Sequence, residues 1–285
     1  MRRNRFIALA YLAPAALLLG VFLVYPVLNT IYLSFFSKNS QQFVGWDNYV
    51  YLFTNESTAV VFRNNLLWLV LFTGAAVAIG LLMAVLANQV RYEAVAKAIV
   101  FVPMAVSFTA AGVIWRFMYI YGAPEFGQIG VMNALLDWLG FDPIPWITNT
   151  SVNNYALILA GVWMWTGFAL VVVSAGLKGI PTEVIEAARI DGASERQIFW
   201  HVILPMLKSV IAVVAVTLVI NSLKVFDLVY VMTSGNYDTD VLANRMFKEM
   251  FTFGNFGRAS AVAVVLLLAI IPVMAFNIRR FRREQ

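Results

Sequence analysis

The sequence contains no cysteine and only one histidine, His201. Without cysteine, the chain can form neither a disulfide framework nor a thiolate zinc site. One histidine is too few for a histidine-based metal cluster, so we expect no metal site. A catalytic centre inside a membrane would need a nucleophile, a base or such a cluster. With these groups absent and no carboxylate pair in an apolar run, the sequence argues against an intramembrane enzyme.

Charged residues are also scarce, at 12% of the 285 residues, whereas soluble domains average about 25%. Hydrophobic residues make up 61%. A soluble core cannot use so much apolar surface, so the chain is predicted to lie in a lipid bilayer. The net charge of +5 would be compatible with nucleic-acid binding. The positive residues lie at the ends of apolar segments, however, so membrane topology explains them better and no nucleic-acid partner is expected.

Six apolar runs poor in charge have the length of about 20 residues that a spanning helix needs. They predict spans at about residues 8–30, 66–87, 99–121, 155–177, 206–228 and 259–278. We therefore expect an all-α, polytopic membrane protein with six transmembrane helices, organised as a single transmembrane domain over residues 1–285. No convincing internal repeat is visible.

Lysine and arginine are distributed unevenly about these six spans. With both termini in the cytoplasm, 13 of the 20 Lys and Arg residues fall on the cytoplasmic side and 7 on the other. Positive residues in short loops favour the cytoplasmic side. We therefore expect a multi-pass protein of the cell (inner) membrane with both termini cytoplasmic. The cluster Arg279-Arg280-Phe281-Arg282-Arg283 is then explained as a stop-transfer anchor at the membrane lipid.

One polar, charged segment interrupts the apolar pattern between spans four and five: EAARIDGASERQIFWHVILP, residues 186–205. Pro181 suits the start of a helix, and Gly192 supplies the left-handed turn that often ends one. Ser194 and Gln197 then have capping-box spacing. The pattern predicts a cytoplasmic helix–turn–helix within residues 178–205. Its small residues leave room for another protein to dock; the alternative is an amphipathic helix that touches only lipid headgroups.

Part of this segment resembles the signature loop of binding-protein-dependent ABC transporter permeases. The matching residues are Glu186, Ala187, Ala188, Gly192, Val202, Leu204 and Pro205, with Val202 in place of the more usual isoleucine. Val24-Tyr25-Pro26 and Gly45-Trp46-Asp47-Asn48-Tyr49 also resemble elements of this family. The stretch Phe226-Asp227-Leu228-Val229-Tyr230-Val231-Met232-Thr233 is similar to the F-D-x-I-Y-x-x-T element of its carbohydrate permeases.

The resemblance implies that residues 186–192, including Asp191, dock into a groove on a separate cytoplasmic ATPase. The sequence agrees in one respect, since it contains no G-x-x-x-x-G-K-[ST] phosphate loop. This chain is then not an enzyme and binds no cofactor itself, while ATP and Mg²⁺ bind to the partner ATPase. The implied assembly contains a homologous second permease subunit, two ABC ATPase subunits and an extracytoplasmic solute-binding protein.

Polar and aromatic residues inside two spans are candidates for a substrate path. The candidates are Trp163 and Trp165 in span four and Asn221, Ser222, Lys224 and Asp227 in span five. Ionisable groups within a membrane are usually functional, and Lys224 and Asp227 would be neighbours if both lay on one helix. The alternatives are snorkelling for Lys224 and hydrogen bonding between helices for the two uncharged residues. The two tryptophans either stack on a sugar ring or pack within the bundle.

These mostly uncharged polar candidates fit a neutral sugar or polyol better than a phosphate or an amino acid. Many sugar permeases have a G-G-P element where this chain has Ser234-Gly235-Asn236-Tyr237, and the segment with residues 242–249 is similar to the α-glucoside branch. We therefore expect ATP-driven import of an α-glucoside or other disaccharide. The alternative is an ion-coupled secondary transporter of a small polar solute, which predicts charged groups deep in several spans and often an inverted repeat.

Overall fold

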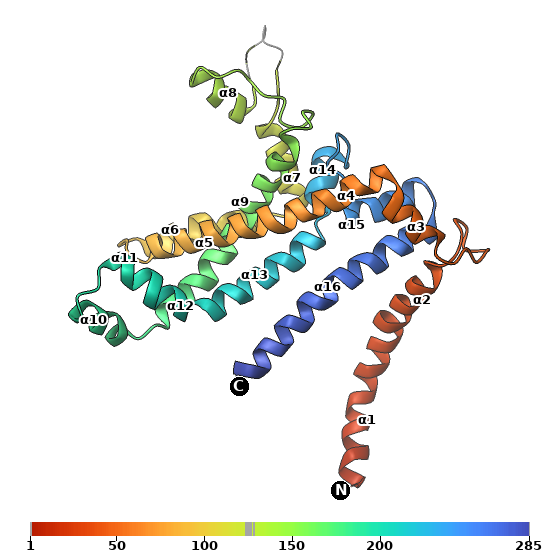
Figure 1. Cartoon of the computed structure of the whole chain (residues 1–285), viewed down its shortest axis with the longest axis horizontal. Helices are drawn as coiled ribbons and strands as arrows, with labels where there is room; N and C mark the ends of the chain where they lie inside the picture. Colours follow the sequence, from red (N-terminus) through yellow and green to blue (C-terminus); the bar gives the residue numbers. More distant parts are fainter. Residues whose placement is uncertain (1, 123–126, 128, 285) are drawn as a thin grey trace. The chain divides into compact units, whose positions relative to one another are not determined.

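The computed structural model describes residues 2–122, 127 and 129–284 (Figure 1). Within this part of the chain the structure is helical, with one isolated β-bridge between Phe36 and Phe43. In the first half the helices are α1 (Arg2–Leu19), α2 (Tyr25–Leu33), α3 (Asp47–Thr54), α4 (Glu56–Leu67), α5 (Thr73–Ala87), α6 (Glu93–Phe101), α7 (Phe108–Met118) and α8 (Val131–Trp138). They continue with α9 (Asn153–Lys178), α10 (Thr182–Ile190), α11 (Glu195–Ile198), α12 (Leu204–Met206), α13 (Lys208–Leu223), α14 (Asp227–Thr233), α15 (Leu242–Phe247) and α16 (Phe256–Glu284).

Four helical segments are long and apolar enough to cross a membrane: Tyr11–Leu33, Glu56–Ala87, Asn153–Lys178 and Phe256–Ala275. Two more stretches pass the same test as bent pairs. Glu93–Ala105 and Phe108–Met118 meet at 100°, and Glu195–Met206 and Lys208–Leu223 meet at 65°. The all-α, polytopic prediction is confirmed, and the six predicted spans correspond to these four segments and two bent pairs.

The bounds of spans two and five in the structure differ from the predicted ones in ways that affect the candidate site. The helix of span two begins at Glu56 rather than near residue 66, because a polar sequence can continue a helix beyond its apolar part. The helix of span five ends at Leu223 rather than near residue 228, and Phe226, with φ of −139°, leaves the helical region before α14 begins. Lys224 and Asp227 therefore do not share a helix, and the expectation that they are helical neighbours is wrong.

The chain divides into two compact units, each described here by itself. The larger comprises Val60–Asn244 and Ala269–Gln285, and the smaller Met1–Ala59 and Arg245–Leu268. In the larger unit, α9 is the central helix and 15 of its 26 residues are buried. A Cβ atom on Gly80 of α5 would lie 2.4 Å from the Cβ of Ala169 on α9. Lipid offers helices no hydrophobic driving force, so close packing at small residues holds these two helices together.

Span three bends because its sequence both ends one helix and begins another. Pro103 lies in the short 3₁₀ turn Val102–Ala105 that follows α6. Ser107 then starts α7, and its side-chain oxygen accepts a hydrogen bond from the backbone N–H of Ala110 at 3.2 Å. Such N-caps satisfy backbone donors that a helix start leaves without partners. The bend leaves Phe108, the first residue of α7, beside α9, where it stacks on Trp165.

In the smaller unit, polar contacts hold the segment after α2 against the start of α16. The buried amide of Asn48 donates to the carbonyls of Ser34 and Phe36 at 2.9 and 2.8 Å. A Cβ atom on Gly257 would lie 2.0 Å from the Phe36 oxygen, so only glycine allows this approach. The N–H of Phe256 donates to the carbonyl of Lys38 at 3.1 Å. These contacts place Lys38 beside the first turn of α16.

Candidate functional site

The polar segment between spans four and five folds as two helices joined by a tight turn. Helix α10 ends at Ile190, and Gly192 follows with φ of +84°. The N–H of Gly192 donates to the carbonyl of Arg189, and that of Ala193 to the carbonyl of Ala188, each at 3.0 Å. This is the Schellman pattern, which satisfies carbonyls at a helix end. The predicted break at Asp191-Gly192 is therefore confirmed.

Helix α11 begins with the capping box that the sequence predicts. The Gln197 N–H donates to Ser194 Oγ at 3.4 Å, and the Ser194 N–H donates to Gln197 Oε1 at 2.8 Å. Arg189 and Glu195 also form an ion pair across the turn, with Nε and Oε1 2.7 Å apart. The hydrogen bond from Arg189 lowers the pKa of Glu195 below its ordinary value. Both side chains are exposed, so this pair adds little stability and the backbone pattern defines the turn.

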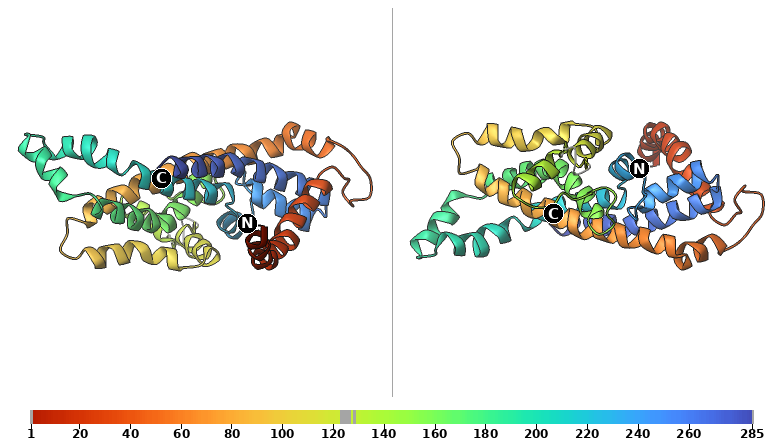
Figure 2. Two further views of the ribbon diagram at one scale, coloured as in Figure 1. Left: turned by 90° about the horizontal axis from the view of Figure 1, so that it is seen from below. Right: turned by 90° about the horizontal axis from the view of Figure 1, so that it is seen from above.

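Most of the surface of α10, and the turn that follows it, is exposed. No residue of α10 is buried, and the apolar side chain of Ile190 is 86% exposed. A Cβ atom on Gly192 would meet nothing within 4 Å. Figures 1 and 2 show that α10 and α11 project from the rest of the larger unit. Glu186, Ala187, Asp191 and Gly192 are exposed here, Ala188 and the later Val202 and Leu204 are partly buried, and Pro205 is exposed.

A polar cluster lies immediately before this segment, at the end of α9. Glu93 Oε1 lies 2.7 Å from the Nζ of Lys178, the last residue of α9, and also contacts Lys97. Lys97 donates to Asn88 Oδ1 at 2.7 Å and to the buried hydroxyl of Ser174. The Ser174 hydroxyl donates to the same Asn88 oxygen at 2.8 Å. This cluster joins the end of α5, the start of α6 and the end of α9, and three residues separate α9 from α10.

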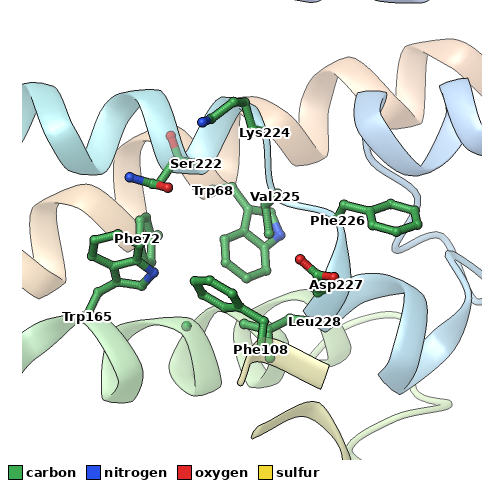
Figure 3. Close-up of a pocket in the computed structure, with 12 residues that line it drawn as sticks. Trp68, Phe72, Phe108, Trp165, Ser222, Lys224, Val225, Phe226, Asp227 and Leu228 are labelled. Carbon is green, nitrogen blue, oxygen red and sulfur yellow. The ribbon is translucent and has the colours of Figure 1, made fainter. Parts of the chain in front are cut away.

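A cavity of about 220 Å³ lies within the larger unit, where span five is broken (Figure 3). Its walls come from α9, α13, α14, the first residue of α7 and the π-helical turn Trp68–Phe72. The lining residues are Trp68, Phe72, Phe108, Gly161, Trp165, Asn221, Ser222, Lys224, Val225, Phe226, Asp227 and Leu228. Aromatic rings thus share the cavity wall with a group of polar side chains. This arrangement suits a ligand that has both apolar faces and hydroxyl groups.

The indole of Trp68 provides an unused hydrogen-bond donor in this wall. Trp68 is 1% exposed, and its Nε1 has no hydrogen-bond partner in the described structure. Buried indole N–H groups usually find an acceptor. Trp68 lies in a π-helical turn, and such turns occur frequently at functional sites. The cavity can therefore offer this donor to an acceptor on a ligand.

Five of the six predicted substrate-path residues line the same cavity, and Trp163 does not. Trp163 packs edge-on against Trp115, with ring centroids 5.7 Å apart. Trp165 instead stacks on Phe108 at 6.2 Å and 29°. For Trp163 the structure thus shows the packing alternative, because residues two apart on an α-helix point in nearly opposite directions. Among the described side chains, no group of three or more ligating residues is gathered for a metal ion.

Sequence reasoning missed the aromatic residues that spans two and three contribute. Trp68 and Phe72 lie close to the predicted start of span two, near residue 66, and nothing in the sequence singles them out as lining residues. The helix begins at Glu56, so both lie well inside it. Phe108 gives no signal in the sequence, since its position depends on the bend of span three. The start of the helix at Glu56 is the feature that would have indicated Trp68.

Comparison with known proteins gives consistent results. The sequence profile of the family described as "Binding-protein-dependent transport system inner membrane component" matches residues 76–281. The chain is 55% identical to the osmoprotective compounds uptake permease protein GgtC of Synechocystis sp., over 96% of this chain and 99% of that one. It is 44% identical to the alpha-glucoside transport system permease protein AglF of Rhizobium meliloti, over 96% and 82% of the two chains.

Solved structures show the same fold at lower identity. A chain from the crystal structure of a bacterial ABC transporter involved in the import of the acidic polysaccharide alginate superposes with a TM-score of 0.80 at 24% identity, covering 97% of this chain and 96% of that one. The structure of a bacterial alginate ABC transporter in complex with an alginate pentasaccharide-bound periplasmic protein gives a TM-score of 0.83 at 23% identity, covering 99% and 96%. At these identities the likeness establishes the fold alone.

Proposed function

The chain belongs to the family of binding-protein-dependent transport system inner membrane components, and from this premise we propose that it is the membrane-spanning permease subunit of an ATP-driven importer of a sugar or glycoside. The observation that carries the proposal is the exposed helix pair α10–α11. It is ordered by its own caps, it carries the E-A-A sequence, and it has open space at its turn. Such a surface suits a rigid contact with another protein.

In this proposal residues Glu186, Ala187, Ala188, Asp191 and Gly192 contact a groove on a separate ATPase, and Ile190 is the exposed apolar side chain available to it. Val202, Leu204 and Pro205 form the return stretch to α13. The chain itself has no phosphate loop, so ATP and Mg²⁺ bind to the two partner ATPase subunits. Closure of the ATPases on ATP draws the docked segments together and shifts the spans between inward- and outward-facing states.

The proposed orientation places α10 and α11 and both termini in the cytoplasm, in a cell (inner) membrane, because lysine and arginine are more frequent on that side. The segments around residues 38–65, 129–154 and 234–258 then face outward and receive the sugar from a solute-binding protein. The periplasmic protein described with one structural neighbour supports such a partner. A homologous second permease subunit completes the pathway.

The cavity at the break of span five is the proposed sugar path in this chain. Trp165 and Phe108 offer ring faces to the C–H surface of a sugar, and Trp68, Asn221 and Ser222 offer hydrogen bonds to its hydroxyls. Lys224 and Asp227 line the same cavity. Its volume of about 220 Å³ is below the roughly 300–1,000 Å³ of ligand pockets, so the companion subunit supplies the opposite wall. The name of one relative above, the alpha-glucoside transport system permease protein AglF, favours a glycoside.

The proposal is tested by affinity purification from detergent with this chain as bait. Wild type should retain an ATPase that the double variant Glu186→Ala/Gly192→Asp loses, while Glu56→Ala, which removes an exposed carboxylate elsewhere, retains it. If folded wild-type protein retains no ATPase, the ABC assignment fails and an ion-coupled transporter becomes the better hypothesis. Lys224 and Asp227 would then be the first residues to substitute.

A further inference from the structure

A second cleft, of about 540 Å³, lies entirely within the smaller unit and shares no lining residue with the cavity of the proposed sugar path. It is unusual for a membrane chain with few charges, because four charged side chains meet in it. Its main lining residues are Lys38, Tyr51, Arg245, Glu249, Phe253 and Arg258. Three cations therefore face one carboxylate, and the cleft has a positive net charge.

The carboxylate in this cleft is already used by one of the three cations. Glu249 Oε1 lies 2.8 Å from Arg245 Nη2, and the two side chains are 3% and 12% exposed. The same guanidinium donates to the hydroxyl of Tyr51 at 3.2 Å and lies 5.8 Å from the ring centroid of Phe253. Its Nε is buried and has no hydrogen-bond partner in the described structure. A buried donor of this kind is costly unless an acceptor reaches it.

The other two cations have no carboxylate within ion-pair distance among the described residues. Arg258 lies over the ring of Tyr51, 3.5 Å from its centroid. This contact uses the face of the guanidinium and leaves its N–H edge for an acceptor. The exposed side chain of Lys38 passes 3.9 Å from the position a Cβ would take on Gly254. Besides Arg245, two positive groups are thus available in the cleft.

The neighbouring helix end strengthens the positive field. The 29-residue helix α16 begins at Phe256 and has no acidic residue in its first turn. Asn255 caps it through its side-chain oxygen, which accepts from the Arg258 N–H at 3.1 Å. The positive end of the helix dipole therefore points toward the cleft and favours an anion there.

We propose that this cleft binds a phosphate group, carried either by the headgroup of an anionic phospholipid or by free inorganic phosphate. The arginine and lysine side chains that line this cleft offer several charged N–H donors, which suit the several oxygens of a phosphate. The stretch Phe256–Ala275 is a candidate span, so the cleft lies where a spanning helix meets water. Lipid phosphates lie at the same level.

The test measures thermal unfolding of the full chain, purified in detergent with its co-purifying subunits. One arm titrates sodium phosphate at constant ionic strength against sodium chloride. The other compares nanodiscs of phosphatidylcholine with nanodiscs that also contain phosphatidylglycerol. A ligand that binds only the folded state raises Tm. A rise with inorganic phosphate assigns the free anion, and a rise only with phosphatidylglycerol assigns the lipid headgroup.

Lys38→Gln and Arg258→Gln should each weaken the apparent affinity about tenfold, equivalent to about 1.4 kcal/mol. Arg116→Gln, which removes an exposed charge in the other unit, should leave the shift unchanged. Arg258→Gln also removes the Tyr51 contact and can reduce folding. The exposed Lys38→Gln variant therefore carries the test alone if that happens. The proposal is overturned if neither probe raises the Tm of the wild type, or if Lys38→Gln gives the wild-type shift.

Discussion

A Cβ atom on Gly161 would lie 2.8 Å from Cζ3 of Trp68, so glycine on α9 is what allows this indole to form a wall of the cavity. Gly161→Ala should displace the buried ring, and overpacking of this kind typically costs about 1–3 kcal/mol. We expect a lower Tm and reduced sugar uptake, measured in proteoliposomes. Gly74→Ala is the matched control, because a Cβ there meets nothing within 4 Å. Equal losses of Tm and of sugar uptake in Gly161→Ala and Gly74→Ala would contradict the proposal that Trp68 forms a wall of the cavity.

The two tryptophans of span four should behave differently when replaced by alanine. Trp165 lines the cavity and stacks on Phe108, whereas Trp163 packs against Trp115. Trp165→Ala should raise the KM for uptake with little change in the protein's expression. Trp163→Ala should lower Tm, with the KM of the surviving protein unchanged. The measurements are uptake kinetics and thermal unfolding, and an unchanged KM in Trp165→Ala would exclude this residue from the sugar path.

Much of the fold is predictable from the sequence, because each span needs one apolar run and the chain has six. The caps of α10 and α11 are predictable too. Gly192 and the pair Ser194 and Gln197 cap these helices through contacts between residues that are close in the sequence. The helix bounds are less predictable. A charge-free run marks where lipid surrounds a helix, and the helix of span two continues past Arg63 to Glu56.

The candidate cavity was only half predictable, for a reason of geometry. Asn221, Ser222, Lys224 and Asp227 stand out because polar residues are costly in lipid. Trp68 and Phe108 do not stand out, since large apolar residues are ordinary in spans. What gives them a place in the cavity is the break after Leu223, the bend before Phe108 and the missing side chain of Gly161. Such relations between distant segments leave no local signal.

The variant Lys97→Met tests whether the polar cluster at the end of α9 only stabilises the helix bundle or also couples it to α10. Lys97 holds Asn88 and Ser174 together, and the loss of a hydrogen-bond partner at a buried group costs about 1–3 kcal/mol. We expect a lower Tm and a weaker response of ATP hydrolysis to the sugar. Arg91→Gln, an exposed charge change nearby, is the control. An unchanged ATPase response in the folded Lys97→Met protein would limit this cluster to a structural role.

Substitutions at Gly192 can separate the effect of its backbone conformation from the effect of side-chain size. Its φ of +84° is unfavourable for side chains with a Cβ, at about 1–2 kcal/mol for a left-handed residue. The space around it is open, so alanine meets no neighbour in the isolated chain. Gly192→Ala should therefore speed hydrogen exchange at residues 189–193, because the turn opens more often, and should reduce ATPase retention.

Gly192→Asn is the matched variant, because asparagine tolerates the left-handed region. It should restore slow exchange at these amides. If it also restores ATPase retention, the turn conformation is what the partner requires. If exchange recovers and retention does not, the partner packs against the glycine itself, and the open space at this position is part of the contact surface. Fast exchange in both variants, at the rate of unfolded peptide, would contradict the capped turn on which the coupling proposal rests.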